Sequence, residues 1–264
     1  MSGTVPILSM VFMFLSCTVC ICLPICIMVY LHIASKADIY PFFVGAAVML
    51  LFAFVLEQAA HRVILSSSAG AVIQGNIWLY ALYGGFMAGL FEETGRFLAI
   101  SFALGKKYLV KNENALMYGA GHGGFESICL VGLTMVNNLI WSYMINTGNV
   151  ASLTGSLSGD ALTQVEQSIT ALITTPSYQF LLGGLERVLA IVLHIALSVL
   201  VWFAVKWRGK LYLYPLAIFL HFAVDAAGAA LSMLGVNVIL IEVVIALFTA
   251  LTVVIARRVW QNTK

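Results

Sequence analysis

Residues 84–105 read GGFMAGLFEETGRFLAISFALG, and they are apolar except at their centre. There, Glu92, Glu93 and Arg96 place two carboxylates and a guanidinium within five consecutive positions. A charged side chain at the middle of a bilayer costs about 2.5–3.5 kcal/mol on insertion scales. If this segment crosses a membrane, its charged groups must therefore face one another or an internal cavity rather than lipid.

The composition of the whole chain indicates a membrane protein. Of its 264 residues, 62% are hydrophobic and only 9% are charged, and the mean hydropathy is +1.02. Soluble domains carry about 25% charged residues, so this chain has too little polar surface to cover itself in water. Its net charge is only +2, without a basic tail or a glycine-rich phosphate loop, and we expect no nucleic-acid partner. We predict an all-α polytopic membrane helix bundle in a lipid bilayer.

Seven segments are long and apolar enough to cross the hydrocarbon core as helices, which takes about 20 residues. They cover residues 5–31, 40–60, 76–105, 115–145, 178–206, 211–232 and 235–256. The first segment lacks the positive start of a signal peptide, so we expect it to remain as a transmembrane helix. The chain has no internal repeat, and we predict a single transmembrane domain over residues 1–264.

The basic residues predict an orientation, because the cytoplasmic loops of membrane proteins are enriched in lysine and arginine. If the seven spans alternate, one side of the membrane receives nearly all of the basic residues outside the spans. These are Lys36, Lys106, Lys107, Lys111, Lys206, Arg208, Lys210, Arg257, Arg258 and Lys264. We predict that the N-terminus lies outside and the C-terminus in the cytoplasm, in an integral protein of the bacterial plasma membrane.

The longest predicted outside connection, residues 147–177, has a helical pattern of its own. Its apolar residues at helical spacing are Leu162, Val165, Ile169 and Leu172. Ser158 or Asp160 can cap the start of this helix, and Pro176 marks its end. We expect a short helix on the outer surface, acting either as a connector or as a lid over a cavity.

Ionisable residues recur in the predicted spans at spacings that pair them on helix faces. Three pairs lie four positions apart: Glu92 with Arg96, His122 with Glu126, and His221 with Asp225. A further span carries Glu186, Arg187 and His194. Counted along helices at about 1.5 Å per residue, these groups can meet in the cytoplasmic half of the bilayer. Glu57 and Glu242 lack motif context, and we expect His32 and His61 to be interfacial.

Histidines and carboxylates from separate helices suit a divalent metal, and zinc most of all. A catalytic zinc site uses about three protein ligands and leaves one position for water. His122 and His221 are the best candidate ligands, and Asp225 can be a further ligand or can orient His221. Glu92 or Glu93 can then act as a general base on the water.

The order of three short motifs resembles the signature of the CAAX-prenyl-endopeptidase and PrsW superfamily of intramembrane proteases. The motifs are Glu92-Glu93-x-x-Arg96, Tyr118-x-x-x-His122 and His221-x-x-x-Asp225. More closely, EETGR followed by GHGGFES, a later ER…H and a final HxxxD resembles the YhfC family of intramembrane metalloproteases. The resemblance runs from about the third span to the sixth.

This resemblance implies a role for each motif. Glu92 would activate water with support from Glu93 and Arg96, while His122 and His221 would bind a metal or polarise the water. Zinc chemistry and a water activated by glutamate and histidine alone both remain open. Residues of the YhfC-like pattern alone are expected in the second shell or as additional ligands; these are Glu126, Glu186 and His194.

The chain departs from the superfamily pattern at three positions. Asp225 takes the last motif position, where CAAX-type enzymes usually have Asn and PrsW-like proteins have Asp. Tyr118 stands where CAAX-type enzymes have Phe, and Arg96 stands where PrsW-like proteins usually have Lys.

Three functions are consistent with these residues. The resemblance implies an intramembrane protease that hydrolyses peptide bonds of a membrane protein or lipidated peptide in or near the bilayer. A proton- or ion-coupled transporter would also use membrane Glu, Asp and His residues, as proton relays. A non-enzymatic scaffold or immunity-type protein with a protease-like fold would not depend on Glu92 for its role.

Overall fold

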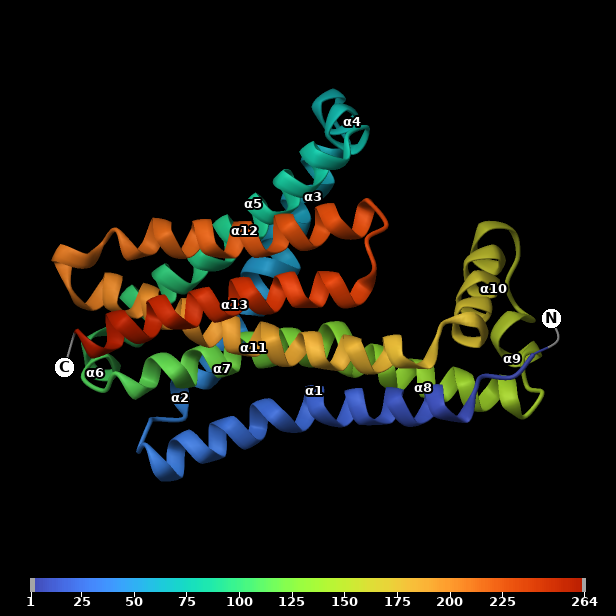
Figure 1. The fold of residues 1–264 in the computed structure, drawn as a ribbon, viewed down its shortest axis with the longest axis horizontal. Coiled ribbons are helices and arrows are strands. Elements are labelled where there is room, and N and C mark those ends of the chain that lie inside the picture. The colour runs from blue at the N-terminus through green and yellow to red at the C-terminus, as the bar shows by residue number, and fades with distance from the viewer. Residues whose placement is uncertain (1–2, 263–264) are drawn as a thin grey trace. The chain divides into compact units, whose positions relative to one another are not determined.

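The computed structural model describes residues 3–262, so that Lys264, one of the residues used to predict orientation, lies outside them. Every regular element among the described residues is a helix (Figure 1). The helices form two compact units. The smaller holds the chain up to Cys22 together with Ser127–Val188, and the larger holds Leu23–Glu126 and the chain from Leu189 onward. The predicted all-α polytopic fold is confirmed, and the single domain stays a prediction.

The helices follow the predicted spans closely, with three π-helical stretches (η1, η2, η3) and one 3₁₀ turn (η4) inserted. In chain order they are α1 (Ile7–Ala34), α2 (Tyr40–Met49), η1 (Leu50–Glu57), α3 (Gln58–Leu65), α4 (Ser68–Gln74), α5 (Ile77–Leu98), η2 (Ala99–Leu104), α6 (Gly105–Leu109), α7 (Glu113–Ser127), η3 (Ile128–Gly132), α8 (Leu133–Asn146), α9 (Ala151–Thr154), α10 (Gly159–Thr174), α11 (Ser177–Lys206), η4 (Arg208–Lys210), α12 (Leu213–Met233) and α13 (Val238–Gln261).

Six helices of the described chain are long and apolar enough to cross a membrane. They are Ile7–Ala34, Tyr40–Leu65, Glu113–Asn146, Ser177–Lys206, Arg208–Met233 and Val238–Gln261. The remaining predicted span, residues 76–105, is also a helix, formed by α5 and η2. Its central charged residues make it less apolar than the six, so the count of seven and the orientation of the termini stay predictions.

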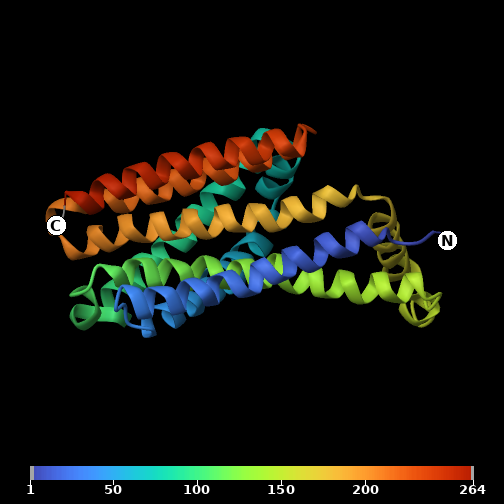
Figure 2. The same cartoon turned by 60° about the horizontal axis from the view of Figure 1, so that its bottom comes forward.

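In the larger unit, α5 packs extensively along α12. Glycines on α5 permit the approach. An ideal Cβ on Gly85 would lie 2.6 Å from the backbone nitrogen of Ala226, and one on Gly89 would lie 2.8 Å from the carbonyl oxygen of Ile218. Helix α12 then turns back into α13 as an antiparallel pair (Figure 2). Small residues thus set the spacing of the helices that carry EETGR and His221.

Helix α7 is held in the same way against α11. A Cβ on Gly119 would lie 2.5 Å from the Cα of Ile195 and 2.9 Å from the carbonyl oxygen of His194, and one on Gly123 would lie 3.0 Å from the Cβ of His194. The glycines around His122 therefore have a packing role, which brings its helix against the one that carries His194.

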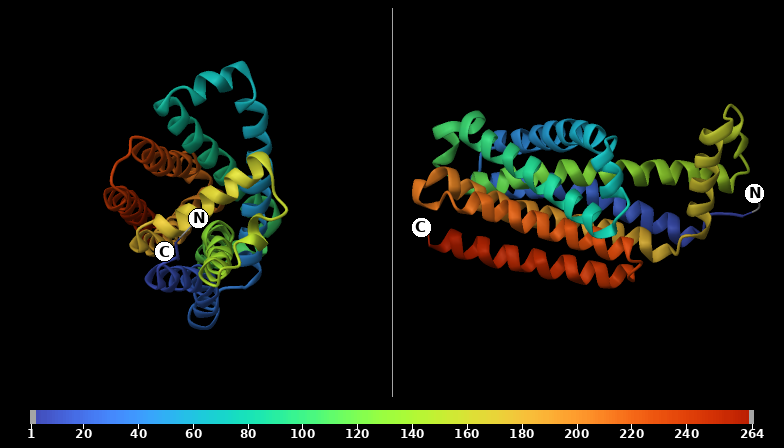
Figure 3. Two further views of the ribbon diagram at one scale, coloured as in Figure 1. Left: turned by 90° about the vertical axis from the view of Figure 1, so that its right-hand side faces the viewer. Right: turned by 90° about the horizontal axis from the view of Figure 1, so that it is seen from above.

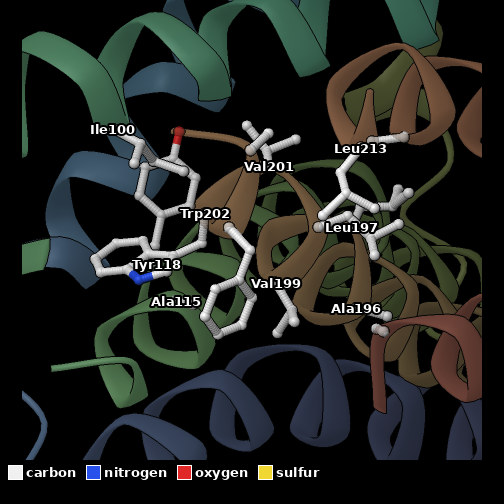
Figure 4. Close-up of a cluster of buried hydrophobic side chains, with 14 of the residues drawn as sticks. Ile100, Ala115, Tyr118, Ala196, Leu197, Val199, Val201, Trp202 and Leu213 are labelled. Atoms are coloured by element: carbon white, nitrogen blue, oxygen red, sulfur yellow. The ribbon is translucent and has the colours of Figure 1, made fainter. Parts of the chain in front are cut away.

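A cluster of apolar side chains lies between η2, α7, α11 and α12 (Figure 4). Tyr118 and Trp202 are its largest members, and both side chains are fully buried. Ile100, Leu197 and Leu213 pack with them. Close van der Waals packing stabilises this cluster. The cluster fixes the segments that follow the EETGR motif on α5 and His194 on α11.

Several connections of the larger unit meet through basic residues. Lys111 Nζ donates to the carbonyl oxygen of Lys36 and to Asp38 Oδ1, both at 2.9 Å. Lys206 Nζ donates to Asn112 Oδ1 at 2.6 Å. The loops that follow α1, α6 and α11 therefore lie at one end of the unit, as alternating spans require.

The smaller unit contains the predicted surface helix, which is α10, Gly159–Thr174. Ser158 precedes it, but its side chain makes no capping hydrogen bond, and the helix ends two residues before Pro176. Ile169 and Leu172 are buried in a cluster with Met13 and Met135. The structure thus has a helix here, while its place on the outer side of the membrane and its role as a lid stay predictions.

Alanine at Gly119 tests the packing of α7 on α11. Because the new Cβ would meet backbone atoms that cannot move separately, we expect Gly119→Ala to lower the free energy of unfolding by about 1–3 kcal/mol. The matched control is Gly84→Ala, since nothing lies within 4 Å of a Cβ there. It should be neutral or stabilising by up to about 1 kcal/mol. Thermal unfolding in detergent measures both, and equal effects would contradict the packing role.

Asp38 should make stability depend on pH. Its carboxylate accepts from Asn114 and Lys111, which lowers its pKa. Because the pKa of Asp38 is lower in the folded state, ionisation of its carboxylate stabilises the fold at pH values above the ordinary aspartate pKa of about 3.9. That stabilisation disappears as the pH falls through the folded pKa. Since the group is partly exposed, we expect at most about 1 kcal/mol. Unfolding of wild type and Asp38→Asn should differ at neutral pH and converge in acid; a constant difference would contradict this.

Candidate functional site

Three buried side chains from three helices of the larger unit converge on one point. Glu92 comes from α5, His194 from α11 and His221 from α12. One ligand atom from each lies within 4.8 Å of the other two. All three are at most 6% exposed. Two imidazoles and a carboxylate at this spacing are a donor set typical of a divalent metal site.

A fully buried ion pair stands behind this trio. Arg96 Nη1 donates to both carboxylate oxygens of Glu93, one helical turn earlier on α5, and neither side chain is exposed. Arg96 Nη2 lies 3.1 Å from His194 Nδ1. Because a guanidinium only donates, His194 Nδ1 must accept, and the ring proton sits on Nε2. Nε2 then donates to Glu126 Oε2 at 2.8 Å, so Arg96 and Glu126 together fix the tautomer of His194.

Glu93 also fixes His221. His221 Nδ1 lies 2.9 Å from Glu93 Oε1 and donates to it, which leaves Nε2 as the atom available for coordination. A carboxylate that accepts from one ring nitrogen while the other binds metal is the usual support of a metal-ligating histidine. His221 Nε2 faces Asp225 Oδ2 at 3.4 Å. The Asp225 side chain is 37% exposed and is the most open carboxylate of the group.

His122 approaches the trio from α7. Its Nε2 lies 3.0 Å from Glu92 Oε2, and its ring is fully buried. The ring centroids of His122 and His194 are 5.0 Å apart, and those of His194 and His221 are 5.2 Å apart. The His194 ring is thus a neighbour of both other imidazoles.

The structure brings together eight of the nine residues predicted for the site. They are Glu92, Glu93, Arg96, His122, Glu126, His194, His221 and Asp225. The ninth, Glu186, belongs to the smaller unit, where it pairs with Arg187. A role for Glu186 at the site stays a prediction.

Glu57 is a further buried carboxylate that was not among the residues predicted for the site. Glu57 is 6% exposed, and its Oε1 lies 3.1 Å from His61 Nε2. His61 Nδ1 in turn lies 2.8 Å from the Tyr83 hydroxyl. Glu57 also interacts electrostatically with His221 and Asp225. The four-residue spacing of Glu57 and His61, shared with the motif pairs, was the signal that could have pointed to it.

The charges favour a bound cation. Glu93 is neutralised by Arg96, whereas Glu92 lies among the imidazoles of His122, His194 and His221. A buried carboxylate needs a compensating charge. A divalent ion held by Glu92, His194 and His221 would supply it, provided that His194 Nδ1 exchanges its hydrogen bond from Arg96 for the metal. The residues present therefore fit a metal.

Comparison with known proteins identifies the family of this chain. The family model for YhfC intramembrane metalloproteases matches residues 19–249. The chain therefore belongs to the YhfC intramembrane metalloprotease family, and it is an integral bacterial membrane protein, as predicted. It is similar to the uncharacterized membrane protein YhfC of Bacillus subtilis (strain 168), with 35% identity over 260 residues, covering 96% of this chain and 98% of that protein. No solved structure matches. The wider likeness to CAAX and PrsW proteins stays a prediction.

Glu93→Gln should destabilise the fold as well as the site. The substitution leaves Arg96 buried without its carboxylate, and breaking a buried ion pair costs about 3–5 kcal/mol. The control is Glu186→Gln, since the Glu186 side chain is 34% exposed and such pairs contribute about 0–1 kcal/mol. Thermal unfolding of both variants measures the difference. Similar losses would show that Arg96 does not depend on Glu93.

Proposed function

We propose that this protein hydrolyses peptide bonds in or near the bilayer, as an intramembrane metalloprotease whose site is Glu92, His194, His221 and the groups around them. The observation that supports this best is the convergence of three buried ligand atoms from three helices within 4.8 Å. Membership of the YhfC family supports the reaction class. The substrate we propose is a membrane protein or a lipidated peptide, since His194 and His221 lie on helices that are long and apolar enough to cross a membrane.

The proposed metal is zinc, which suits imidazole and carboxylate ligands. Glu92, His194 and His221 would hold it. When bound, such an ion polarises a carbonyl group and makes water easier to deprotonate. Glu93 acts as a positioning residue, because it orients His221 through Nδ1 and leaves Nε2 for the metal. Arg96 holds the Glu93 carboxylate in place.

Hydrolysis also needs a carboxylate that takes a proton from the attacking water and returns it to the leaving nitrogen as the C–N bond breaks. The sequence-based expectation assigns this role to Glu92, with His122, His221 and Asp225 around the metal or the water. The 3.0 Å contact between His122 and Glu92 supports it. If Glu92 instead occupies a metal position, Asp225 becomes the base, because its side chain is open and faces His221.

Two other functions use the same residues. A proton- or ion-coupled transporter would use the neighbouring imidazoles and carboxylates as a relay. A scaffold or immunity-type protein would keep the fold without the chemistry. The excess of negative charge around Glu92 and the family assignment favour the metalloprotease.

Elemental mass spectrometry on detergent-purified protein tests the metal. We expect about one zinc per chain in wild type and none in His194→Ala or His221→Ala, because each variant removes an imidazole ligand. The control is His32→Ala, an exposed histidine at the end of α1 that contacts the carbonyl oxygen of Ala37. Metal-free wild-type protein, folded and never exposed to chelator, would contradict the metal site.

Glu92→Gln separates ligand from base and enzyme from the other functions. If Glu92 is the base, the variant should keep the metal and cleave about 10²–10⁴-fold more slowly. If Glu92 is a ligand, the metal content and the cleavage rate should fall together. Profiling new peptide ends in membranes of cells expressing wild type or variant measures cleavage. Identical peptide ends in wild type and Glu92→Gln would contradict the protease. Proton or ion flux into proteoliposomes that is driven by a pH gradient and lost in Glu92→Gln would establish the transporter.

A further inference from the structure

An apolar groove runs between α7, α11 and α13 in the larger unit, away from the candidate site. Its volume is about 280 Å³. Leu116, Val192, Ile195, Ala196, Val199, Val253, Ala256, Arg257 and Trp260 line it. Arg257 is the only charged residue in this lining.

The groove lies on a different face of α11 from the candidate site. Val192, Ile195, Ala196 and Val199 recur at the spacing of one helical stripe. His194 lies about 100° or more around the helix from each of them, given 3.6 residues per turn. Occupation of the groove is therefore separate from the metal site and does not depend on the proposed function.

Helix α13 closes the groove incompletely. Only Thr249, Thr252 and Ala256 are buried on this 24-residue helix. It lies beside α12 at the edge of the larger unit (Figure 3). An empty gap forfeits dispersion contacts for the atoms that line it. In a bilayer the molecules able to fill such a gap are hydrocarbon chains.

The charge at one end of the groove specifies the kind of chain. Arg257 is exposed, and Arg258 follows it. The end of α13 lies at the same end of the unit as α6, where Lys106 and Lys107 lie (Figure 1). Trp260 lines the groove beside Arg257, and tryptophan is typical of the level of lipid headgroups. No carboxylate lines the groove, so its net positive charge is complementary to a phosphate headgroup with net negative charge.

We propose that this groove binds one acyl chain of an anionic phospholipid, with Arg257 contacting its phosphate. The lipid completes the packing of α13 against α11. It is a structural ligand, and cleavage chemistry takes no part in its binding.

Native mass spectrometry of the full chain in detergent tests this, with phosphatidylglycerol and phosphatidylcholine of identical acyl chains as probes. We expect phosphatidylglycerol to bind about fivefold more tightly, the effect of one basic residue near an anionic surface. Arg257→Gln should abolish that preference. Arg258→Gln is the matched control, since it removes the same charge from a residue that does not line the groove, and it should retain the preference.

Val253→Phe provides a second test, because Val253 lines the groove and is only partly buried. The larger side chain should lower the affinity for both lipids. Equal affinity of wild type for the two lipids, equal loss in Arg257→Gln and Arg258→Gln, or unchanged binding in Val253→Phe would each overturn the proposal. Zinc content is measured on the same samples, so that a failure of the lipid proposal can be told apart from a failure of the proposed metal site.

Discussion

The buried pair of Glu93 and Arg96 is the interaction on which the rest of the site depends. Neither side chain reaches solvent, and each holds a histidine of another helix: Glu93 accepts from His221, and Arg96 donates to His194. One turn of α5 thus fixes the ring orientations on α11 and α12. A buried pair of this kind contributes little net stability by itself, because both charges must be desolvated. We interpret it as a device for specifying geometry.

That geometry is possible only because the backbones approach closely. Gly85 and Gly89 set α5 against α12, and Gly119 and Gly123 set α7 against α11. In a membrane, where apolar surface gains little from leaving lipid, close van der Waals packing through small residues holds helices together. The polar site and the glycine contacts are therefore parts of one arrangement.

The sequence predicts the helices and most members of the site, because long apolar segments and displaced charges are visible without a structure. It could not assign partners across helices. The four-residue spacing places His122 and Glu126 on one face of α7, yet Glu126 contacts His194, and His122 contacts Glu92. It also gives His122 and Asp225 as first choices for a metal, whereas the convergent trio includes His194. Which side chains meet depends on the crossing angles and rotations of the helices, and the periodicity of one helix does not contain this information.

The three π-helical stretches adjoin the polar residues: η1 ends at Glu57, η2 follows the EETGR turn, and η3 begins two residues after Glu126. A π turn closes one residue later than an α turn. Each stretch therefore accommodates an extra residue and changes the angular register between the segments on either side. A count of 3.6 residues per turn therefore does not predict which residues share a helix face on the two sides of a π-helical stretch. An evolutionary insertion or deletion of one residue could be absorbed there, with the polar face of each helix left in place and the opposite end of the same helix rotated toward new neighbours.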